Sequence, residues 1–326
     1  MRRKTQDVDL AQRRLVLPVV FAVRGGHAGR EWTADRTLKI EKNSRNVLTV
    51  RFDDVGENWE HWFLLSADRH HDSRDCNREL EIEHLDMVKE RGGHIFDFGD
   101  IFDAMQGKYD PRRSYPEMRP EYMDMMQDGR GYLDVITEDA SEFYKKYADR
   151  FLLIARGNHE AAIQIHNDTD LINRLVGKLN TKARTQINTG EYGGWVRFLF
   201  KIGKTQSESV NLKYFHGSGG GGPVTKGVIQ SNRQAVYLPD AQIVVNGHIH
   251  ESWLLALKRE RISERGVISQ DVQYHVRTAT YKDDYLDGAN GWHVQRGSPP
   301  KPMGATWLRF YHDRKHVRIQ LLQDIR

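Results

Sequence analysis

The sequence predicts an α/β fold in which two mixed β-sheets pack face to face and helices lie outside them. Short apolar runs rich in aromatic and β-branched residues recur through the chain, which is typical of buried strands. Two amphipathic segments separate three central runs, as expected of helices. Further strand-like segments follow up to the end of the chain. Strands and helices in this order fit two packed sheets with helices on their outer faces.

The N-terminal part, residues 1–60, is predicted to be an extension that carries a β-hairpin. Residues 37–40 and 47–52 have strand patterns with a polar turn between them. The apolar run at residues 15–23 has the length of a short signal-peptide core, but Arg24 follows it in place of a small-residue cleavage site. We therefore expect a buried segment there. No apolar run in the chain reaches the ~18 residues of a membrane span.

The main domain is predicted over residues 61–326. Between its first two strands, residues 77–91 place Ile82, Leu85 and Val88 on one helical face. The expected strands of this domain are residues 61–67, 93–98, 151–155, 195–202, 211–215, 241–245, 252–258, 272–278, 305–311 and 316–322.

A second helix is expected over residues 137–150, where Thr137 can cap the N-terminus. Before it, residues 105–134 are predicted to be an insertion, because the segment is long, irregular in pattern and punctuated by proline. Residues 281–302 are rich in glycine and proline and are predicted to form a loop near the functional site.

Five short polar motifs stand where predicted strands end. In layered α/β folds, ligands bind outside the carboxyl ends of strands. The motifs offer oxygen and imidazole ligands and no thiolate, which suits Mn²⁺, Fe or Zn²⁺. Any one motif alone could be a turn, so the prediction rests on the ordered set. The motifs are Asp68-Arg-His70, Gly99-Asp100-Ile-Phe-Asp103, Gly157-Asn158-His159-Glu160, His216-Gly217 and Gly247-His248-Ile-His250.

These motifs resemble those of the calcineurin-like metallophosphoesterases, and the resemblance covers about residues 62–250. Segments 107–113 and 216–223 also look similar to a group of uncharacterised phosphoesterases encoded by bacteriophages and prophages. The resemblance implies the two-sheet fold and a site with two divalent ions. Mn²⁺ is the first expectation, with Fe, Zn²⁺ and Ni²⁺ as alternatives. His71, directly after His70, is a competing ligand that the pattern leaves open.

Residue by residue, the resemblance implies two metal sites with a shared ligand and an acid beside them. Asp100 would bridge the two ions. His159 would face the leaving group, with Asp103 paired to it to fix its tautomer. The first ion would be held by Asp68, His70 and His250, and the second by Asn158, His216 and His248.

Two segments are candidates for substrate binding. In the insertion, Arg112, Arg113 and Arg119 are interleaved with tyrosines, a combination that can contact phosphates and stack on bases. A solvated loop or an oligomer contact would explain the same residues. In the glycine-rich loop after His216, Gly217 and Gly219 could present main-chain N–H groups to a phosphate, or could only let the chain turn.

The sequence therefore predicts a cytoplasmic hydrolase that uses two metal ions to cleave phosphodiesters, with DNA or RNA as substrate, through a hydroxide that bridges the metals. The net charge of +4 allows nucleic acid without demanding it, and the single Cys76 suits a reducing compartment. Ala161 follows Glu160, with no counterpart to the arginine expected in protein phosphatases of the family. The alternatives are a phosphomonoesterase, a cyclic-nucleotide phosphodiesterase, or a non-catalytic metal-binding scaffold. The oligomeric state is left open.

Overall fold

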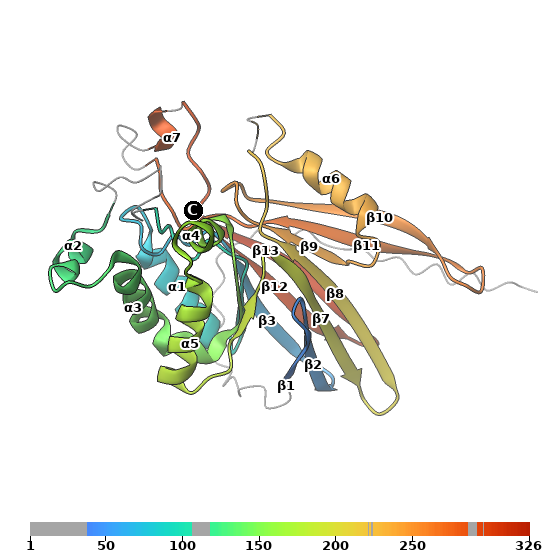
Figure 1. Cartoon of the computed structure of the whole chain (residues 1–326). Helices are drawn as coiled ribbons and strands as arrows, with labels where there is room; N and C mark the ends of the chain where they lie inside the picture. The colour runs from blue at the N-terminus through green and yellow to red at the C-terminus, as the bar shows by residue number, and fades with distance from the viewer. Residues whose placement is uncertain (1–37, 106–117, 221, 223, 286–291, 296) are drawn as a thin grey trace, which may run out of the picture.

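Two mixed β-sheets pack face to face, and helices cover the outer face of one of them (Figure 1). The structure is a computed structural model, and it describes residues 38–105, 118–220, 222, 224–285, 292–295 and 297–326. The predicted fold class is confirmed in these residues.

The larger sheet brings together strands from the start, middle and end of the described chain. β2 runs parallel to β7, and β9 lies parallel to both β8 and β11. The remaining neighbours are antiparallel. In spatial order its strands are β1 (Leu38–Ser44), β2 (Val47–Val55), β7 (Gly193–Ile202), β8 (Gln206–Phe215), β9 (Ile243–Asn246), β11 (Ile268–Arg277) and β10 (Trp253–Ile262).

The smaller sheet has a parallel half that carries three of the predicted motifs. β3, β4, β5 and β6 are parallel neighbours, whereas β12 and β13 add antiparallel strands at the other edge. In spatial order its strands are β13 (His316–Ile325), β12 (Gly304–Asp313), β3 (Glu60–Ser66), β4 (His94–Asp97), β5 (Phe151–Ala155) and β6 (Asn188–Gly190).

Aromatic side chains from both sheets fill the space between them. Phe52 stacks on Phe200 with ring centroids 5.5 Å apart, and Phe310 lies 4.8 Å from Phe198. Phe63 contacts Phe96, Phe198 and Phe310 and is fully buried. Aromatic pairs at these distances add to the free energy gained from burial. This core fixes the two sheets relative to each other, and therefore fixes the strand ends that carry the motifs.

A second core lies between the smaller sheet and the helices, which Figure 1 shows on the left. α6 instead lies beside the larger sheet, and Leu238 at its end packs with Ala241 and Val244. The helices are α1 (Arg78–Glu90), α2 (Pro120–Met126), α3 (Tyr132–Tyr144), α4 (Asn158–Asn167), α5 (Leu171–Ala183), α6 (Val228–Tyr237) and α7 (Trp292–Gln295).

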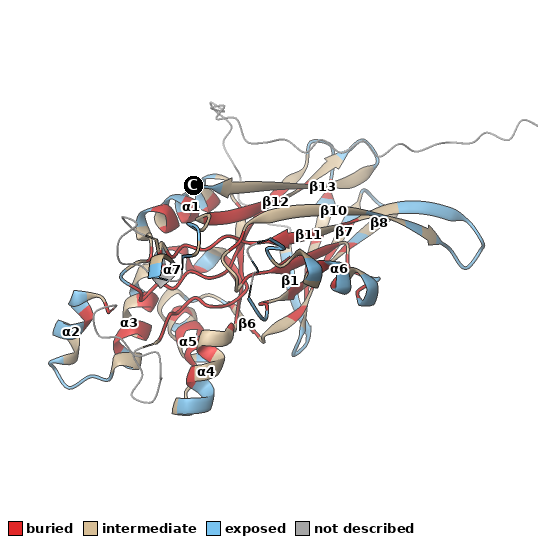
Figure 2. Cartoon of the chain, turned by 90° about the horizontal axis from the view of Figure 1, so that it is seen from above, coloured by how far each residue is buried: buried red, intermediate tan, exposed pale blue. Residues whose placement is uncertain are grey.

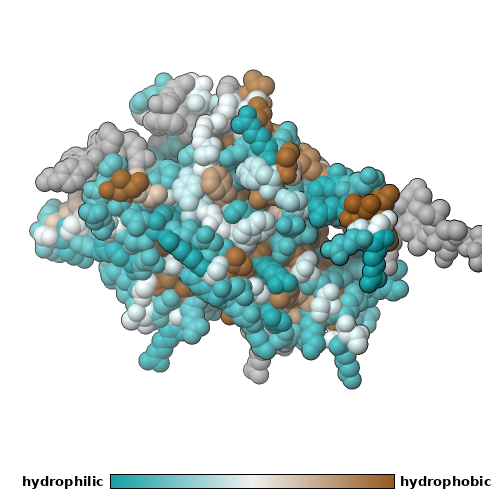
Figure 3. Space-filling model, turned by 45° about the vertical axis from the view of Figure 1, so that its right-hand side comes forward, coloured by the Kyte–Doolittle hydropathy of each residue, from teal (hydrophilic) through white to brown (hydrophobic). Residues whose placement is uncertain are grey.

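The outer end of the β10–β11 hairpin is exposed, whereas the ends of both strands near the site are more buried (Figure 2). Figure 3 shows a mainly hydrophilic face on which hydrophobic side chains form small, separate patches. Within the part of the chain that the structure describes, no helix is long and apolar enough to cross a membrane.

The predicted hairpin at the N-terminal end is present, and β2 joins the larger sheet through β7 rather than standing alone. The predicted residues 15–23 lie outside the described residues. α1 begins as predicted, because the Asn77 side chain accepts a hydrogen bond from the Leu80 N–H at 2.9 Å.

The predicted helix at residues 137–150 is wrong in its start. α3 begins at Tyr132, and Thr137 lies inside it, where its hydroxyl donates to the Leu133 carbonyl at 2.6 Å. The residue at the capping position is Gly131, which has no side chain to accept a hydrogen bond, so the sequence gives no capping signal for this start. Residues 145–150 form a 3₁₀ helix. The insertion is less irregular than predicted, because it contains α2 and the start of α3.

Arg69 is a fully buried cation that joins the turn after β3 to α1 and β4. Its guanidinium donates to Glu81 at 2.8 Å and to Asp97 at 2.6 Å, and it lies 4.9 Å from the Tyr281 ring centroid. All three charged side chains are fully buried. Removing one partner of such a group leaves uncompensated buried charge, which is strongly destabilising.

We predict that Arg69→Met lowers the free energy of unfolding by about 3–5 kcal/mol, because Glu81 and Asp97 would remain buried without their counter-ion. Denaturant unfolding followed by circular dichroism measures this. Arg74→Met is the control, since the Arg74 side chain is 45% exposed and water screens its ion pair with Asp75; it should cost less than about 1 kcal/mol. Equal effects of the two substitutions would contradict the prediction.

Candidate metal centre

The predicted ligands converge at one edge of the two packed sheets. Asp68 and Asp100 follow β3 and β4 of the smaller sheet, and Asn158 is the first residue of α4, just after β5. His216 follows β8 of the larger sheet, and His248 and His250 follow β9. Within these five strands, β3, β4 and β5 are parallel neighbours, as are β8 and β9, so their carboxyl ends open onto the same space.

Five of these ligands have left-handed backbone conformations, which cost free energy in any residue with a β-carbon. The remaining structure therefore has to hold these sharp turns, and each turn ends a strand and aims a side chain at the centre. The φ angles are 54° for Asp68, 46° for His70, 55° for Asp100, 78° for His248 and 54° for His250.

Two glycines, Gly157 and Gly247, allow the ligand loops to approach closely. A β-carbon on Gly157 would lie 2.1 Å from an Asp100 carboxylate oxygen, and one on Gly247 would lie 2.6 Å from Asp68. These contacts are closer than any side chain tolerates, so glycine is required.

Gly217, a predicted phosphate contact, also has a packing role. Its φ is 136°, and a β-carbon there would meet the His248 side chain at 2.6 Å. Gly219 has a φ of 76° and no atom within 4 Å of the β-carbon position, so only its conformation favours glycine.

Asp68, His70 and His250 form the first group of possible metal ligands. His70 Nε2 lies 3.1 Å from His250 Nε2, and His250 Nε2 lies 3.6 Å from Asp68 Oδ1. Asp68 Oδ1 is buried and has no hydrogen-bond partner among the described residues. Burial raises the pKa of Asp68 to about 6 against the opposing effect of His216. A buried carboxylate oxygen without a donor, facing imidazole nitrogens, fits a bound cation.

Asp100, His216 and His248 form the second group. His216 Nε2 lies 3.1 Å from Asp100 Oδ2, and its Nδ1 donates to the Phe98 carbonyl at 2.9 Å. The Asn158 amide oxygen lies 3.0 Å from His216 Nε2 and 2.6 Å from His248 Nδ1. The Asn158 oxygen and the second group therefore share one centre.

Asp100 connects the two groups. Its ligand oxygen also clusters with His70 of the first group and with His159. Burial opposes protonation of His216, but the charge of Asp100, its hydrogen bond and the charge of Asp68 together outweigh burial and raise the pKa of His216 to about 10. The carboxylates of the centre thus favour positive charge between them, which is the condition for holding cations.

His159 lies beside the centre at the start of α4. Its main-chain N–H donates to Asp100 Oδ1 at 2.9 Å, and its Nδ1 lies 2.5 Å from the Asp103 carbonyl oxygen. The carbonyl can only accept, so Nδ1 carries the proton and the neutral ring keeps Nε2 as its basic atom. Nε2 lies 3.8 Å from Asp100, and the side chain is 12% exposed.

Asp103 contacts His159 as predicted, but through its main chain and not through its carboxylate. Asp103 meets His159 through its main-chain carbonyl, whereas its carboxylate lies 2.9 Å from His70 Nδ1 and 3.0 Å from Lys282 Nζ. The loop is held in this conformation by Asp72, which accepts the N–H groups of Asp103 and the next residue.

His71 does not compete with His70. It is fully buried and turned away from the centre, with Nδ1 3.1 Å from Glu81 and Nε2 3.3 Å from Asp139. Its ring packs on Phe143 at 4.5 Å.

Glu160 is a supporting residue to which the sequence analysis gave no role. Its buried carboxylate accepts the main-chain N–H groups of Asp100 at 3.2 Å, Phe102 at 2.9 Å and Gly157 at 2.8 Å. It therefore ties the turn after β4 to the turn after β5. Its place at the end of the motif Gly157-Asn158-His159-Glu160 was the one feature of the sequence that could have indicated this role.

The candidate substrate arginines give a mixed result. Arg112 and Arg113 lie outside the described residues. Arg119 donates to the Cys76 carbonyl at 3.3 Å and pairs with Glu121 at 3.4 Å, and its side chain is 15% exposed. Arg119 thus holds the start of α2 against the loop before α1.

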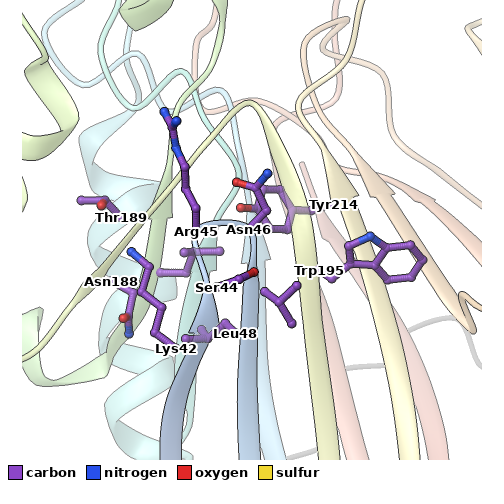
Figure 4. A pocket seen from close by; sticks show the side chains of 11 residues that line it. Lys42, Ser44, Arg45, Asn46, Leu48, Asn188, Thr189, Trp195 and Tyr214 are labelled. Carbon is purple, nitrogen blue, oxygen red and sulfur yellow. The ribbon is translucent and has the colours of Figure 1, made fainter.

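A small hollow lies away from the metal centre, beside the β1–β2 hairpin (Figure 4). Its volume is ≈ 10 Å³, room for about one water molecule, so it does not provide a substrate site. The labelled residues that line it are Lys42, Ser44, Arg45, Asn46, Leu48, Asn188, Thr189, Trp195 and Tyr214.

No family model and no curated protein matches the chain. Several solved structures are similar to it. A conserved uncharacterised protein from Streptococcus pneumoniae, described as a predicted phosphoesterase, matches 81% of this chain and 90% of its own, with 10% identity and a TM-score of 0.29. A Staphylococcus aureus protein provisionally named a 5′-nucleotidase, in complex with alpha-ketoglutarate, matches 81% of this chain and 54% of its own, with 12% identity and a TM-score of 0.40.

Vps29 from Entamoeba histolytica, complexed with Zn²⁺, matches 80% of this chain and 97% of its own, with 10% identity and a TM-score of 0.28. At such low identities and TM-scores, the likeness to these structures does not show what this chain does.

We predict that protein purified without chelator holds up to two transition-metal ions per chain and that Asp100→Asn loses both, because Asp100 belongs to the second group and its carboxylate also clusters with His70 of the first. Elemental analysis of the two proteins measures the metal content. Asp86→Asn is the matched control, since Asp86 accepts from Tyr147 in the helical layer and should leave the metal content unchanged. Full metal content in Asp100→Asn would refute the assignment of the shared ligand.

Proposed function

We propose that this chain is a hydrolase that uses two divalent ions to cleave phosphate esters, with phosphodiesters of DNA or RNA as its substrates. The observation that supports this best is the pair of ligand groups that meet at Asp100, with His159 beside them. The ordered motifs that resemble the calcineurin-like metallophosphoesterases support the same activity.

The ligand chemistry supports two ions of the Mn²⁺ type. Asp100 would contact both ions. Carboxylate, amide oxygen and imidazole suit Mn²⁺ first and Fe, Zn²⁺ or Ni²⁺ as alternatives, because the centre offers no thiolate. Two such ions supply Lewis acidity and neutralise the charge of a phosphate ester. Asp68, His70 and His250 would hold one, and Asn158, His216 and His248 the other.

His159 is suited to protonate the leaving oxygen. The hydrogen bond from its Nδ1 to the Asp103 carbonyl orients the ring. Its Nε2 faces the centre and lies 3.8 Å from Asp100 Oδ2. In the imidazolium form, Nε2 carries the second proton and can transfer it to the departing alkoxide. The exposed part of the side chain gives the leaving group access.

Preference for diesters is supported by two features of the motifs. Gly247-His248-Ile-His250 resembles the repair-exonuclease and phosphodiesterase branches of the family, and Ala161 follows Glu160 without a counterpart to the arginine of protein phosphatases. Activity on bis-p-nitrophenyl phosphate, p-nitrophenyl phosphate, a cyclic nucleotide and single-stranded DNA, each with Mn²⁺, tests the proposal. Turnover of only the monoester or only the cyclic nucleotide would replace the diester assignment with that alternative. No turnover by metal-loaded protein would favour a scaffold.

We predict that His159→Asn keeps both metal ions but lowers kcat on a diester with an alkoxide leaving group by about 10²–10⁴-fold, the usual contribution of general acid catalysis. The loss should shrink with p-nitrophenolate as leaving group, because that anion needs less protonation. Steady-state kinetics on both substrates and metal analysis measure these effects.

His166→Asn is the matched control, because His166 is exposed on the same helix, α4, and should change neither kcat nor metal content. Equal losses on good and poor leaving groups in His159→Asn would assign His159 to stabilising charge in the transition state instead of transferring a proton.

We predict that Arg112→Ala combined with Arg113→Ala weakens binding of single-stranded DNA and flattens its salt dependence by about 0.7 log–log units per lost phosphate contact. Turnover of a small diester should remain, because that substrate is too short to reach the insertion. Arg119 is left intact because it supports the fold at Cys76.

Fluorescence anisotropy across a range of salt concentrations measures this binding. Arg74→Ala combined with Arg130→Ala is the control, since both arginines are exposed and their ion pairs with Asp75 and Asp128 are close in sequence. Unchanged affinity in the Arg112–Arg113 variant at low and high salt would favour the small-substrate alternatives.

A further inference from the structure

Lys282 is a buried cation that stands behind the first ligand group. The residue is 8% exposed, and its ammonium lies 3.0 Å from Asp103 Oδ1 and 3.3 Å from Asp284 Oδ1. Both carboxylates are buried as well. An ammonium group has three donors and no acceptor, so one lysine can bind both carboxylates at once.

Each of the two carboxylates lies against a different histidine of the first group. Asp103 Oδ1 is 2.9 Å from His70 Nδ1, and Asp284 Oδ2 is 3.9 Å from His250 Nδ1. The opposite nitrogens, Nε2 of His70 and Nε2 of His250, face each other at 3.1 Å. Lys282 therefore links the two carboxylates behind both imidazoles, whose Nε2 atoms point into the centre.

The main chain around Lys282 supports the third ligand of the same group. The Thr280 hydroxyl donates to the Asp68 carbonyl at 2.8 Å, and the Tyr281 N–H donates to the same carbonyl at 3.0 Å. The Lys282 N–H in turn donates to the Thr280 hydroxyl at 3.0 Å. One short segment thus contacts Asp68 directly and reaches His70 and His250 through carboxylates.

The second group is held by different contacts. His216 Nδ1 donates to the Phe98 carbonyl, and His248 Nδ1 faces the Asn158 amide oxygen. The charged contacts of Lys282 go to Asp103 and Asp284, which lie behind the first group. The support that Lys282 provides is therefore specific to one of the two groups.

We propose that Lys282 is a positioning residue that sets the metal affinity of the Asp68–His70–His250 group and leaves that of the second group unchanged. The inference rests on the proposed metal centre. Without the ammonium, two buried carboxylates would repel each other and move, and the imidazoles of His70 and His250 beside them would lose their alignment. Loss of such a supporting contact typically lowers metal affinity about 10–100-fold.

The experiment is a Mn²⁺ titration of metal-free protein by equilibrium dialysis, with electron paramagnetic resonance to distinguish single from paired ions. Wild type should bind two Mn²⁺ per chain and show a coupled pair. Lys282→Met should bind one with wild-type affinity and the other about 10–100-fold more weakly, and show a single-ion signal at intermediate Mn²⁺.

Lys182→Met is the matched control, because Lys182 also bridges two carboxylates, Glu138 at 2.6 Å and Glu142 at 2.5 Å, but in the helical layer. It should bind Mn²⁺ as wild type does. Lys282→Arg keeps the positive charge and should recover part of the lost affinity.

Asp284→Asn removes the charge of one linked carboxylate and keeps the ion pair between Lys282 and Asp103. This variant therefore tests the proposed support of the first group if Lys282→Met does not fold. It should weaken only one of the two ions. Unchanged Mn²⁺ binding in Asp284→Asn and folded Lys282→Met, or equal weakening of both ions, would overturn the inference. The metal centre itself would still stand if Asp100→Asn loses both ions, whereas a wild type without Mn²⁺ binding would overturn both proposals.

Discussion

The position of Asp100 depends on a single buried carboxylate, that of Glu160. Glu160 accepts N–H groups from the turn after β4 and from the turn after β5, so the two turns cannot move independently. Gly157 then sits so close to the Asp100 carboxylate that a β-carbon has no room. Burial and the nearby Asp100 charge raise the pKa of Glu160 to about 8. The cost of burying this group is offset by three main-chain donors that would otherwise lack acceptors.

The left-handed turns of the ligands are stable because both sheets surround them. A single residue such as His70 or His250 would not keep a positive φ in isolation. Here Arg69, the residue before His70, is held by buried ion pairs. Arg277 donates to the Gly247 carbonyl at 2.6 Å, in the turn before His248. The aromatic core between the sheets fixes the strand ends from which these turns start. The geometry of the centre is therefore a property of the whole two-sheet fold.

The sequence was sufficient to predict most of the strands, and it predicted that the polar residues after several of them would converge, because these residues follow short apolar runs typical of buried strands. It was not sufficient for contacts between distant segments. The contact of Lys282 with Asp103 joins residues 179 positions apart, and no periodic pattern encodes it. The start of α3 was missed because Gly131 offers no capping side chain. α5 was also missed, although the sequence carries its signals, because Asp170 caps it and Leu171, Leu175 and Leu179 share one face. β6 was missed because it is too short to show a strand pattern.

The two ligand groups differ in what stands behind their histidines, and this difference has chemical consequences. Carboxylates lie behind His70 and His250, whereas a main-chain carbonyl accepts from His216. A carboxylate behind an imidazole raises the basicity of the ligating nitrogen more than a neutral carbonyl does. Lys282 moderates this effect by neutralising part of the carboxylate charge, so it both orients the first group and limits the negative charge gathered there. Two ions held in such different surroundings would not be equivalent, and an unequal pair is suited to a reaction in which one end of the phosphate ester is attacked while the other departs.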